Sequence, residues 1–142
     1  MNMITYGSGI ESDPWLLKTP SQTSEFQAWR DPAKSALVVQ VGTTRLSYQL
    51  RCIEDLQAML KGRGEWVPLG NADEGKPVVA GSVEAWARDE ANPVAGYYGM
   101  RKGYRGRFGN YVPPVMELLG LAEVEHLARG NRMRAVISQI RI

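Results

Sequence analysis

The chain has very few of the residues on which most active sites depend. Its 142 residues include one Cys and one His. A single Cys excludes an internal disulfide and any zinc site built from several thiolates, and a single His excludes a site that needs two imidazoles from one chain. Cys52 and His126 remain as a conceivable nucleophile and base. Because Cys is most often a buried core residue, the sequence predicts no catalytic or metal-binding residue and favours a protein that is not an enzyme.

Long apolar runs and targeting signals are also lacking. No apolar run approaches the roughly 18 residues of a membrane-spanning helix. Residues 1–13 have no basic region followed by an apolar stretch, as a signal peptide would have. We therefore expect a cytoplasmic protein without a membrane partner. The glycines from Gly96 to Gly103 match neither a P-loop nor a dinucleotide fingerprint, so no cofactor is expected.

The composition is that of a globular protein, with 44% hydrophobic and 23% charged residues. The length suits a single domain over residues 1–142. Residues 70–81 contain three Gly together with Asn71, Asp73, Lys76 and Pro77, a composition typical of a linker, and divide the chain into two parts, 1–70 and 82–142. A part of roughly 60 residues is only marginally stable alone. We therefore expect the two parts to share one core.

The first part is predicted to be an antiparallel sheet with one packed helix. Its β-branched and alternating segments are typical of strands, and apolar residues at helical spacing follow them. The predicted elements are an irregular lead-in over 1–23 pinned by Trp15, a strand (favoured over a short helix) over 24–30, a β-hairpin of 36–41 and 45–51, a helix over 53–60 ending near Gly62, and an edge strand over 65–69.

The second part is predicted to be mainly helical and to end in a β-hairpin. The predicted elements are a helix over 83–89 with Ser82 as N-cap, a second helix starting at Asn92-Pro93, a glycine-rich loop or close-packed helix over 94–109, a buried helix over 112–120 opened by Pro113 and Pro114, and a hairpin of 124–128 and 132–137 with a Gly-Asn turn. The fold class is thus α+β.

The order of helices and a basic hairpin within residues 82–137 resembles a winged-helix module, which implies nucleic-acid binding. A helix that reads base edges exposes polar side chains, whereas the helix over 112–120 would expose little beyond Glu117. Under this resemblance, the basic loop and hairpin would contact phosphates.

Five stretches resemble a second group of proteins. They are Asp13 to Pro20, Thr23 to Glu25, Gly106 to Pro114, Leu119 to Leu121 and Asn131 to Arg134. Together they are similar to a family of short bacterial proteins, a domain of unknown function that covers nearly the whole chain. The resemblance implies a single cytoplasmic domain and supplies no catalytic residue.

Positive charge is concentrated at the end of the chain. The whole chain has 17 Lys and Arg against 15 Asp and Glu, a net charge of +2. From Arg101 onward there are eight basic and three acidic residues. Seven of the eight are Arg, whose guanidinium binds phosphate through two parallel hydrogen bonds. The candidate residues for binding nucleic acid or another anion are Arg101, Lys102, Tyr104, Arg105, Arg107, Arg129, Arg132 and Arg134.

We predict a non-enzymatic nucleic-acid-binding or regulatory module that uses this Arg-rich region. Its candidates for stacking on bases are Tyr97, Tyr98, Tyr104 and Phe108. In a purely structural interpretation, the arginines are solvated or pair with Glu123 and Glu125. The alternative function is a protein-interaction module, expected to be a homodimer, since the four Trp and six Tyr are residue types that dominate interfaces.

Overall fold

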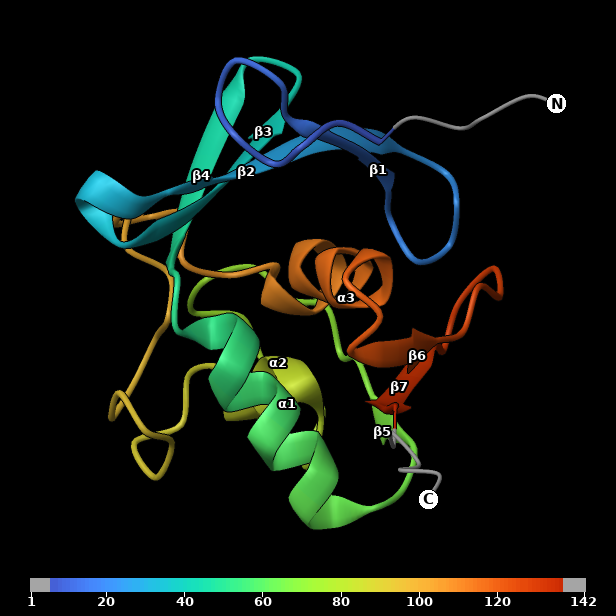
Figure 1. Ribbon diagram of the computed structural model, residues 1–142. Coiled ribbons are helices and arrows are strands. Elements are labelled where there is room, and N and C mark those ends of the chain that lie inside the picture. The colour runs from blue at the N-terminus through green and yellow to red at the C-terminus, as the bar shows by residue number, and fades with distance from the viewer. Residues whose placement is uncertain (1–5, 137–142) are drawn as a thin grey trace, which may run out of the picture.

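Two antiparallel sheets and three α-helices make up the part of the chain that the computed structural model describes, residues 6–136 (Figure 1). The first sheet contains β1 (Trp15–Lys18), β2 (Glu25–Asp31), β3 (Ala36–Val41) and β4 (Thr44–Gln49) in sequence order. In the second sheet, β7 (Arg132–Ala135) lies between β5 (Val67–Pro68) and β6 (Ala122–Val124). The helices are α1 (Cys52–Arg63), α2 (Val83–Trp86) and α3 (Phe108–Leu118), and a short 3-10 helix, η1 (Pro32–Lys34), joins β2 to β3.

Helix α3 packs against the first sheet and lies between the two sheets (Figure 1). The ring of Phe26 on β2 meets Tyr111 edge-on at 5.1 Å, and Tyr48 on β4 meets Phe108 at 5.5 Å. Such edge-to-face pairs stabilise a core beyond the area that they bury. Buried residues from both sides of the 70–81 segment belong to one hydrophobic cluster. The two parts of the chain therefore have a common core.

The predicted hairpin and α1 are confirmed. Strands β3 and β4 pair from Ala36↔Gln49 to Val41↔Thr44. Helix α1 buries the predicted Ile53, Leu56 and Leu60. It continues past Gly62 to Arg63 and ends at Gly64, which is in the left-handed conformation that favours glycine.

The prediction of an irregular lead-in over 1–23 is wrong at residues 15–18, which form β1. This strand pairs with β2 from Trp15↔Ala28 to Lys18↔Glu25. Trp15 and Leu17 are buried, so the lead-in is pinned as expected, while Leu16 between them is exposed. A strand of four residues is too short for its alternation to be distinguished from a loop by sequence alone.

No helix starts at Asn92, and this prediction is wrong. The Asn92 side chain instead closes a turn: its Oδ1 accepts from the N–H groups of Val94 (3.0 Å) and Gly96 (3.3 Å). Its Nδ2 donates to the carbonyl of Trp86 at 2.6 Å. Asn side chains stabilise turns through the same bonds that cap helices, and for this reason the sequence signal is ambiguous.

Helix α3 begins at Phe108 rather than at residue 112, so Pro113 and Pro114 lie inside it. Helix α2 has its predicted N-cap, Ser82, but covers only Val83–Trp86. The predicted mainly helical, winged-helix-like second part is therefore wrong. Within residues 82–136, the β6–β7 hairpin is present, but β5 of the first part completes its sheet.

Candidate functional site

The segment that follows Tyr98 runs along the edge of β4. The N–H of Gln49 donates to the carbonyl of Tyr98 at 2.9 Å, and the N–H of Met100 donates to the carbonyl of Ser47 at 2.7 Å. These bonds extend the first sheet beyond β4 and bring residues 99–104 to its outer edge. The predicted Arg101, Lys102 and Tyr104 are therefore positioned by backbone pairing and not by the glycine-rich loop alone.

Two arginines on β4 and the segment beside it are each held by an aromatic ring. The Arg101 guanidinium lies over the Tyr104 ring, 4.0 Å from its centroid, and Nη1 donates to the carbonyl of Arg45 at 2.7 Å. The Arg45 guanidinium lies 5.0 Å from the centroid of Trp29, and its Nε donates to Gln40 Oε1 at 2.8 Å. Each guanidinium is thus oriented by an aromatic ring and one hydrogen bond.

Lys102 follows and is exposed, as are Arg45 and Arg101. We name Arg45, Arg101 and Lys102 the β4-edge cations. Within residues 6–136, no carboxylate lies within 4.0 Å of their charged groups. This set is a local excess of positive charge.

Arg105 and Arg107, two other predicted site residues, pair with the turn over residues 72–76. Arg105 Nε is 3.8 Å from Glu74 Oε1, and Arg107 Nε donates to Asp73 Oδ1. The hydrogen bond to Asp73 raises the pKa of the Arg107 guanidinium. Glu74 also accepts from the backbone N–H of Gly103 and of Arg105. We call residues 101–107 the Arg-rich loop. Asp73 and Glu74 neutralise two of its four cations and hold the loop against the turn.

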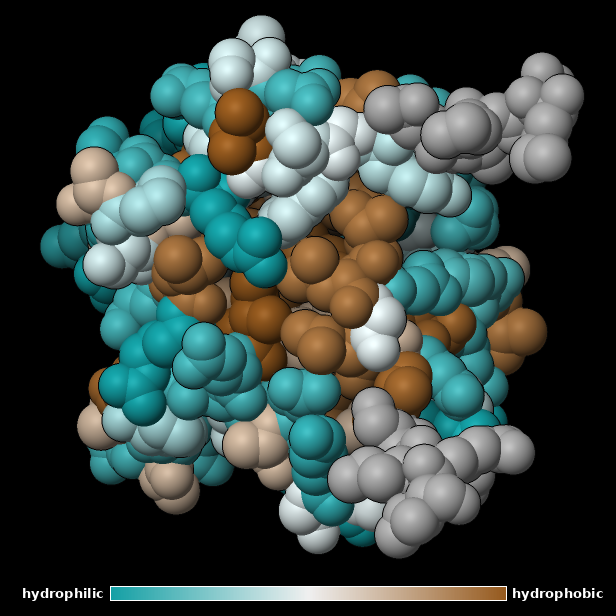
Figure 2. Space-filling view, in the orientation of Figure 1, coloured by the Kyte–Doolittle hydropathy of each residue, from teal (hydrophilic) through white to brown (hydrophobic). Residues whose placement is uncertain are grey.

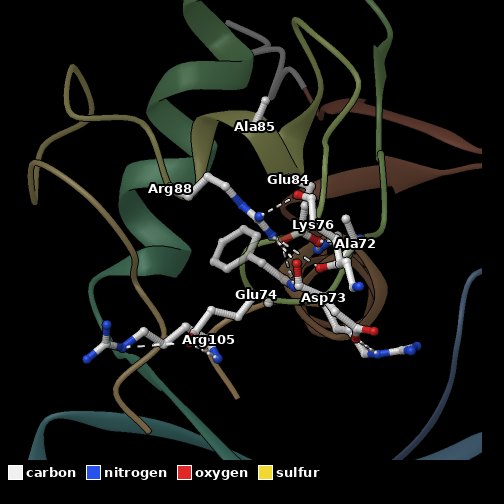
Figure 3. A network of polar contacts seen from close by, with 12 residues as sticks. Ala72, Asp73, Glu74, Lys76, Glu84, Ala85, Arg88 and Arg105 are labelled. Carbon is white, nitrogen blue, oxygen red and sulfur yellow. Dashed lines mark hydrogen bonds and ion pairs between the residues drawn. The ribbon is translucent and has the colours of Figure 1, made fainter. Parts of the chain in front are cut away.

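Glu84 and Arg88 anchor this turn (Figure 3). Neither residue was predicted from the sequence as part of a site. Arg88 donates to the carbonyls of Ala72 (3.2 Å), Asp73 (3.3 Å) and Lys76 (3.1 Å) and to Glu84 Oε2 (3.2 Å). The only sequence signal for this pair is the i, i+4 spacing of opposite charges, which is common on solvated helix faces.

Glu84 is 1% exposed and receives the first N–H groups of α3. Its carboxylate accepts from Gly109 N at 2.9 Å and from Phe108 N at 3.3 Å. Burial raises the pKa of Glu84, although its hydrogen bonds act in the opposite direction. The carboxylate therefore serves as a distant N-cap, which explains why α3 begins where it does.

A surface cavity of about 660 Å³ opens beside Tyr104, the ring that carries Arg101. We call it the Tyr104 cavity. Its lining comes from the β3–β4 hairpin, the 72–76 turn, the Arg-rich loop and α3: Val41, Thr44, Leu46, Asp73, Glu74, Gly103, Tyr104, Gly106, Arg107 and Tyr111. Of the four aromatic residues that sequence suggested for base stacking, Tyr104 is 42% exposed, Tyr98 and Phe108 are buried, and Tyr97 is half-buried beneath Arg88.

The second Arg group lies elsewhere on the molecule. The β6–β7 hairpin that carries it is on the other side of α3 from β4 (Figure 1). Arg132 pairs with Glu125 through two bonds of 2.8 Å, and Arg134 Nε donates to Glu123 at 2.6 Å. Both guanidinium groups lie over Trp66. Arg129 is exposed in the hairpin loop. The structure therefore does not bring Arg129, Arg132 and Arg134 close to the Arg-rich loop.

Cys52 and His126 occupy separate places. Cys52 is completely buried at the start of α1, and burial raises the pKa of its thiol far above the usual range. His126 bonds to Glu117 Oε2 at 2.7 Å and to the carbonyl of Pro20 at 2.8 Å. Burial lowers the pKa of His126, but these two bonds more than offset it and raise the pKa overall. A thiol held protonated is a poor nucleophile.

Two other kinds of feature are absent from residues 6–136. No group of three or more His, Cys, Asp or Glu side chains is arranged to hold a metal ion there. None of the helices in the same range has the length and apolarity needed to cross a membrane.

Comparison with models of protein families assigns the chain to a family. A model described as a family of unknown function, DUF6855, matches residues 7–136. The chain belongs to the DUF6855 family. No curated protein and no solved structure matches it. The resemblance to a short domain of unknown function is thus confirmed, and DUF6855 membership assigns no activity. The site must be interpreted from its own geometry.

Proposed function

We propose that the protein binds nucleic acid through the phosphates, and that the β4-edge cations make the contact. The observation that carries the proposal is that three exposed cations on β4 and the segment beside it, Arg45, Arg101 and Lys102, have no carboxylate partner in the described part of the chain. Nucleic-acid affinity derives largely from such cations, which replace the counterions of the phosphates.

The orientation of the two arginines supports a phosphate ligand. Arg45 and Arg101 each use one N–H group on a protein oxygen, and a guanidinium has five. Stacking on Trp29 and Tyr104 restricts their side-chain rotation before a ligand arrives. A phosphate therefore meets donors that have already lost much of their conformational entropy.

The proposal uses fewer residues than the sequence suggested. Arg105 and Arg107 are engaged by Glu74 and Asp73, and Arg132 and Arg134 by Glu125 and Glu123. We assign these four to holding loops in place. Arg45 joins the proposed site from the first part of the chain.

The proposal is tested by reversing charge at the site. We expect Arg101→Glu with Lys102→Glu to weaken binding of a fluorescent oligonucleotide at low salt at least tenfold. In the wild type, the logarithm of affinity should fall with the logarithm of salt concentration with a slope of about −2, since three cations release roughly 0.7 counterion each on a single strand. Fluorescence anisotropy at several salt concentrations measures both quantities.

The matched control makes the same change of charge far from the site, with Lys61→Glu and Arg129→Glu, both exposed. It should bind nearly as the wild type does. Equal loss in the two double variants, or a wild type that ignores oligonucleotides at low salt, would overturn the proposal.

Self-association is a second candidate function. Apolar side chains gather on the molecular face over α3 and the adjoining end of α1 (Figure 2). Leu118, Leu119 and Leu121, at the end of α3, are each only half-buried. A twofold contact between two copies would cover the same patch on both chains at once.

Light scattering tests this second candidate. A dimer predicts a mass near twice 15.8 kDa, and Leu118→Lys with Leu121→Lys should return the protein to a monomer. A wild type that is monomeric at high concentration would contradict it.

A further inference from the structure

The Tyr104 cavity adjoins Arg101 through one shared side chain. The Tyr104 ring carries the Arg101 guanidinium, 4.0 Å from its centroid, and Tyr104 also lines the cavity. A ligand whose phosphate meets Arg101 therefore has its next chemical group at the mouth of the cavity. In a nucleotide, that group is the sugar and its base.

We propose that the Tyr104 cavity receives an unstacked base, so that the nucleic acid bound is single-stranded. This inference rests on the proposed function and specifies its ligand. Within a duplex, the base is stacked and paired and can enter a cavity only after being flipped out, at a cost of a few kcal/mol. A single strand presents its bases without that cost.

The chemistry of the lining fits a base better than a phosphate. Leu46 and Tyr111 contribute apolar surface, which suits the faces of a planar ring. Asp73 and Glu74 lie in the same lining, paired with Arg107 and Arg105. The cavity thus has no excess of positive charge to attract a phosphate, in contrast to the β4-edge cations outside it.

The carboxylates also indicate which bases should be favoured. The Asp73 side chain is 53% exposed, and Oδ1 alone accepts from Arg107. Its other oxygen accepts no hydrogen bond from the described residues, and Asp73 lines the cavity. Carboxylates accept hydrogen bonds from the exocyclic amino group at position 4 of cytosine, whereas thymine has a carbonyl oxygen, O4, at that position. We therefore expect cytosine to bind more tightly than thymine.

The experiment compares four probes in fluorescence anisotropy and on a heparin column. They are a cytosine oligonucleotide, a thymine oligonucleotide, an abasic oligonucleotide of the same length and charge, and heparin, which carries charge but no base. The wild type should bind the cytosine strand at least fivefold more tightly than the abasic one, given the usual effect of removing a base–aromatic stack. It should bind the thymine strand with intermediate affinity.

Three variants locate the effect. Tyr104→Ala should reduce the protein's affinity for the cytosine strand to its affinity for the abasic strand. Tyr104→Phe keeps the ring and should leave the affinity for the cytosine strand unchanged. Asp73→Asn should bring the ratio of the affinities for the cytosine and thymine strands close to one. Because that ratio compares strands of equal charge, it is independent of the general gain in positive charge.

The outcomes separate this inference from the proposed function. If the wild type is retained on heparin with the expected salt dependence but binds all three strands equally, the base-binding inference is overturned and phosphate binding stands. A Tyr104→Ala protein that keeps its preference over the abasic strand overturns it as well. If neither heparin nor any strand is bound, the proposed function is itself overturned.

Discussion

A single buried carboxylate, Glu84, joins two segments that are distant from it in sequence and also pairs with Arg88, four residues away. It bonds to the start of α3 through Gly109, to the 72–76 turn through the N–H of Ala72, and to Arg88. Removing one partner of a buried ion pair leaves the other charge without compensation. Glu84 is therefore the residue through which the wall of the Tyr104 cavity is most directly coupled to the core.

We predict that Glu84→Ala lowers the free energy of unfolding by about 3–5 kcal/mol, the usual cost of breaking a buried ion pair. Glu84→Gln keeps a hydrogen-bond acceptor for Gly109 and should cost less. Urea denaturation measures both. Glu54→Ala, at an exposed acidic residue in the first turn of α1, is the control and should change stability by well under 1 kcal/mol. A Glu84→Ala variant as stable as that control would contradict the prediction.

Among single residues, sequence was informative where the interaction is local. Ser82 was predicted as an N-cap, and its side chain accepts from the N–H of Ala85 three residues later. Glu84 was not identified, because an acidic residue in the first turn of a helix is normally an exposed partner of the helix dipole. Its burial depends on α3 and the 72–76 turn, which local sequence does not describe.

Between elements, the Arg-rich loop and the 72–76 turn pack backbone against backbone. A Cβ atom at position 106 would lie 2.3 Å from the backbone nitrogen of Glu74. The Tyr48 hydroxyl donates to the carbonyl of Gly106 at 2.8 Å, so the same residue is fixed from β4. Glycine is thus required at position 106 because two segments of the chain approach closely, and not because of its backbone angles.

We predict opposite effects of alanine at two glycines. Gly106→Ala should destabilise the protein by about 1–3 kcal/mol, as overpacking does. Gly62→Ala should stabilise it by up to about 1 kcal/mol, because Gly62 lies inside α1 and, apart from its chain neighbours and the helix's own backbone, no atom lies within 4 Å of its added Cβ. Thermal and urea unfolding of the two variants measure the contrast. A Gly106→Ala protein as stable as the wild type would mean that the loop is not packed on the turn.

The elements predicted well are those whose pattern is complete within a few neighbouring residues. The alternation of Leu46, Tyr48 and Leu50 indicated β4, and helical spacing indicated α1. The four residues of β1 and the start of α3 depend on partners elsewhere, β2 and Glu84. Strand β5 also depends on a distant partner. Its position at a sheet edge was predicted, but its pairing with β7, which joins Val67 to Met133, was not.

For the whole molecule, folding redistributes a charge pattern that looks simple along the chain. The basic excess after residue 100 is divided between two sides of α3. Asp73 and Glu74, in the segment between the two parts, neutralise part of it, while Arg45 of the first part has no carboxylate partner among the described residues. The proposed binding surface is consequently small, with three cations, and a modest, strongly salt-dependent affinity is expected.

Composition and local pattern by themselves determined that this is an α+β protein with a β-hairpin, a helix and a basic end, and that it lacks a second Cys or His for most catalytic and metal chemistry. These properties depend on residue counts or on neighbours within one turn or one strand. The tertiary structure decided which arginines are neutralised, that Arg101 bonds to the backbone of Arg45, and that a cavity lies beside Tyr104. The reason is physical: an ion pair or a cavity is formed by side chains that only folding brings within a few ångströms of each other.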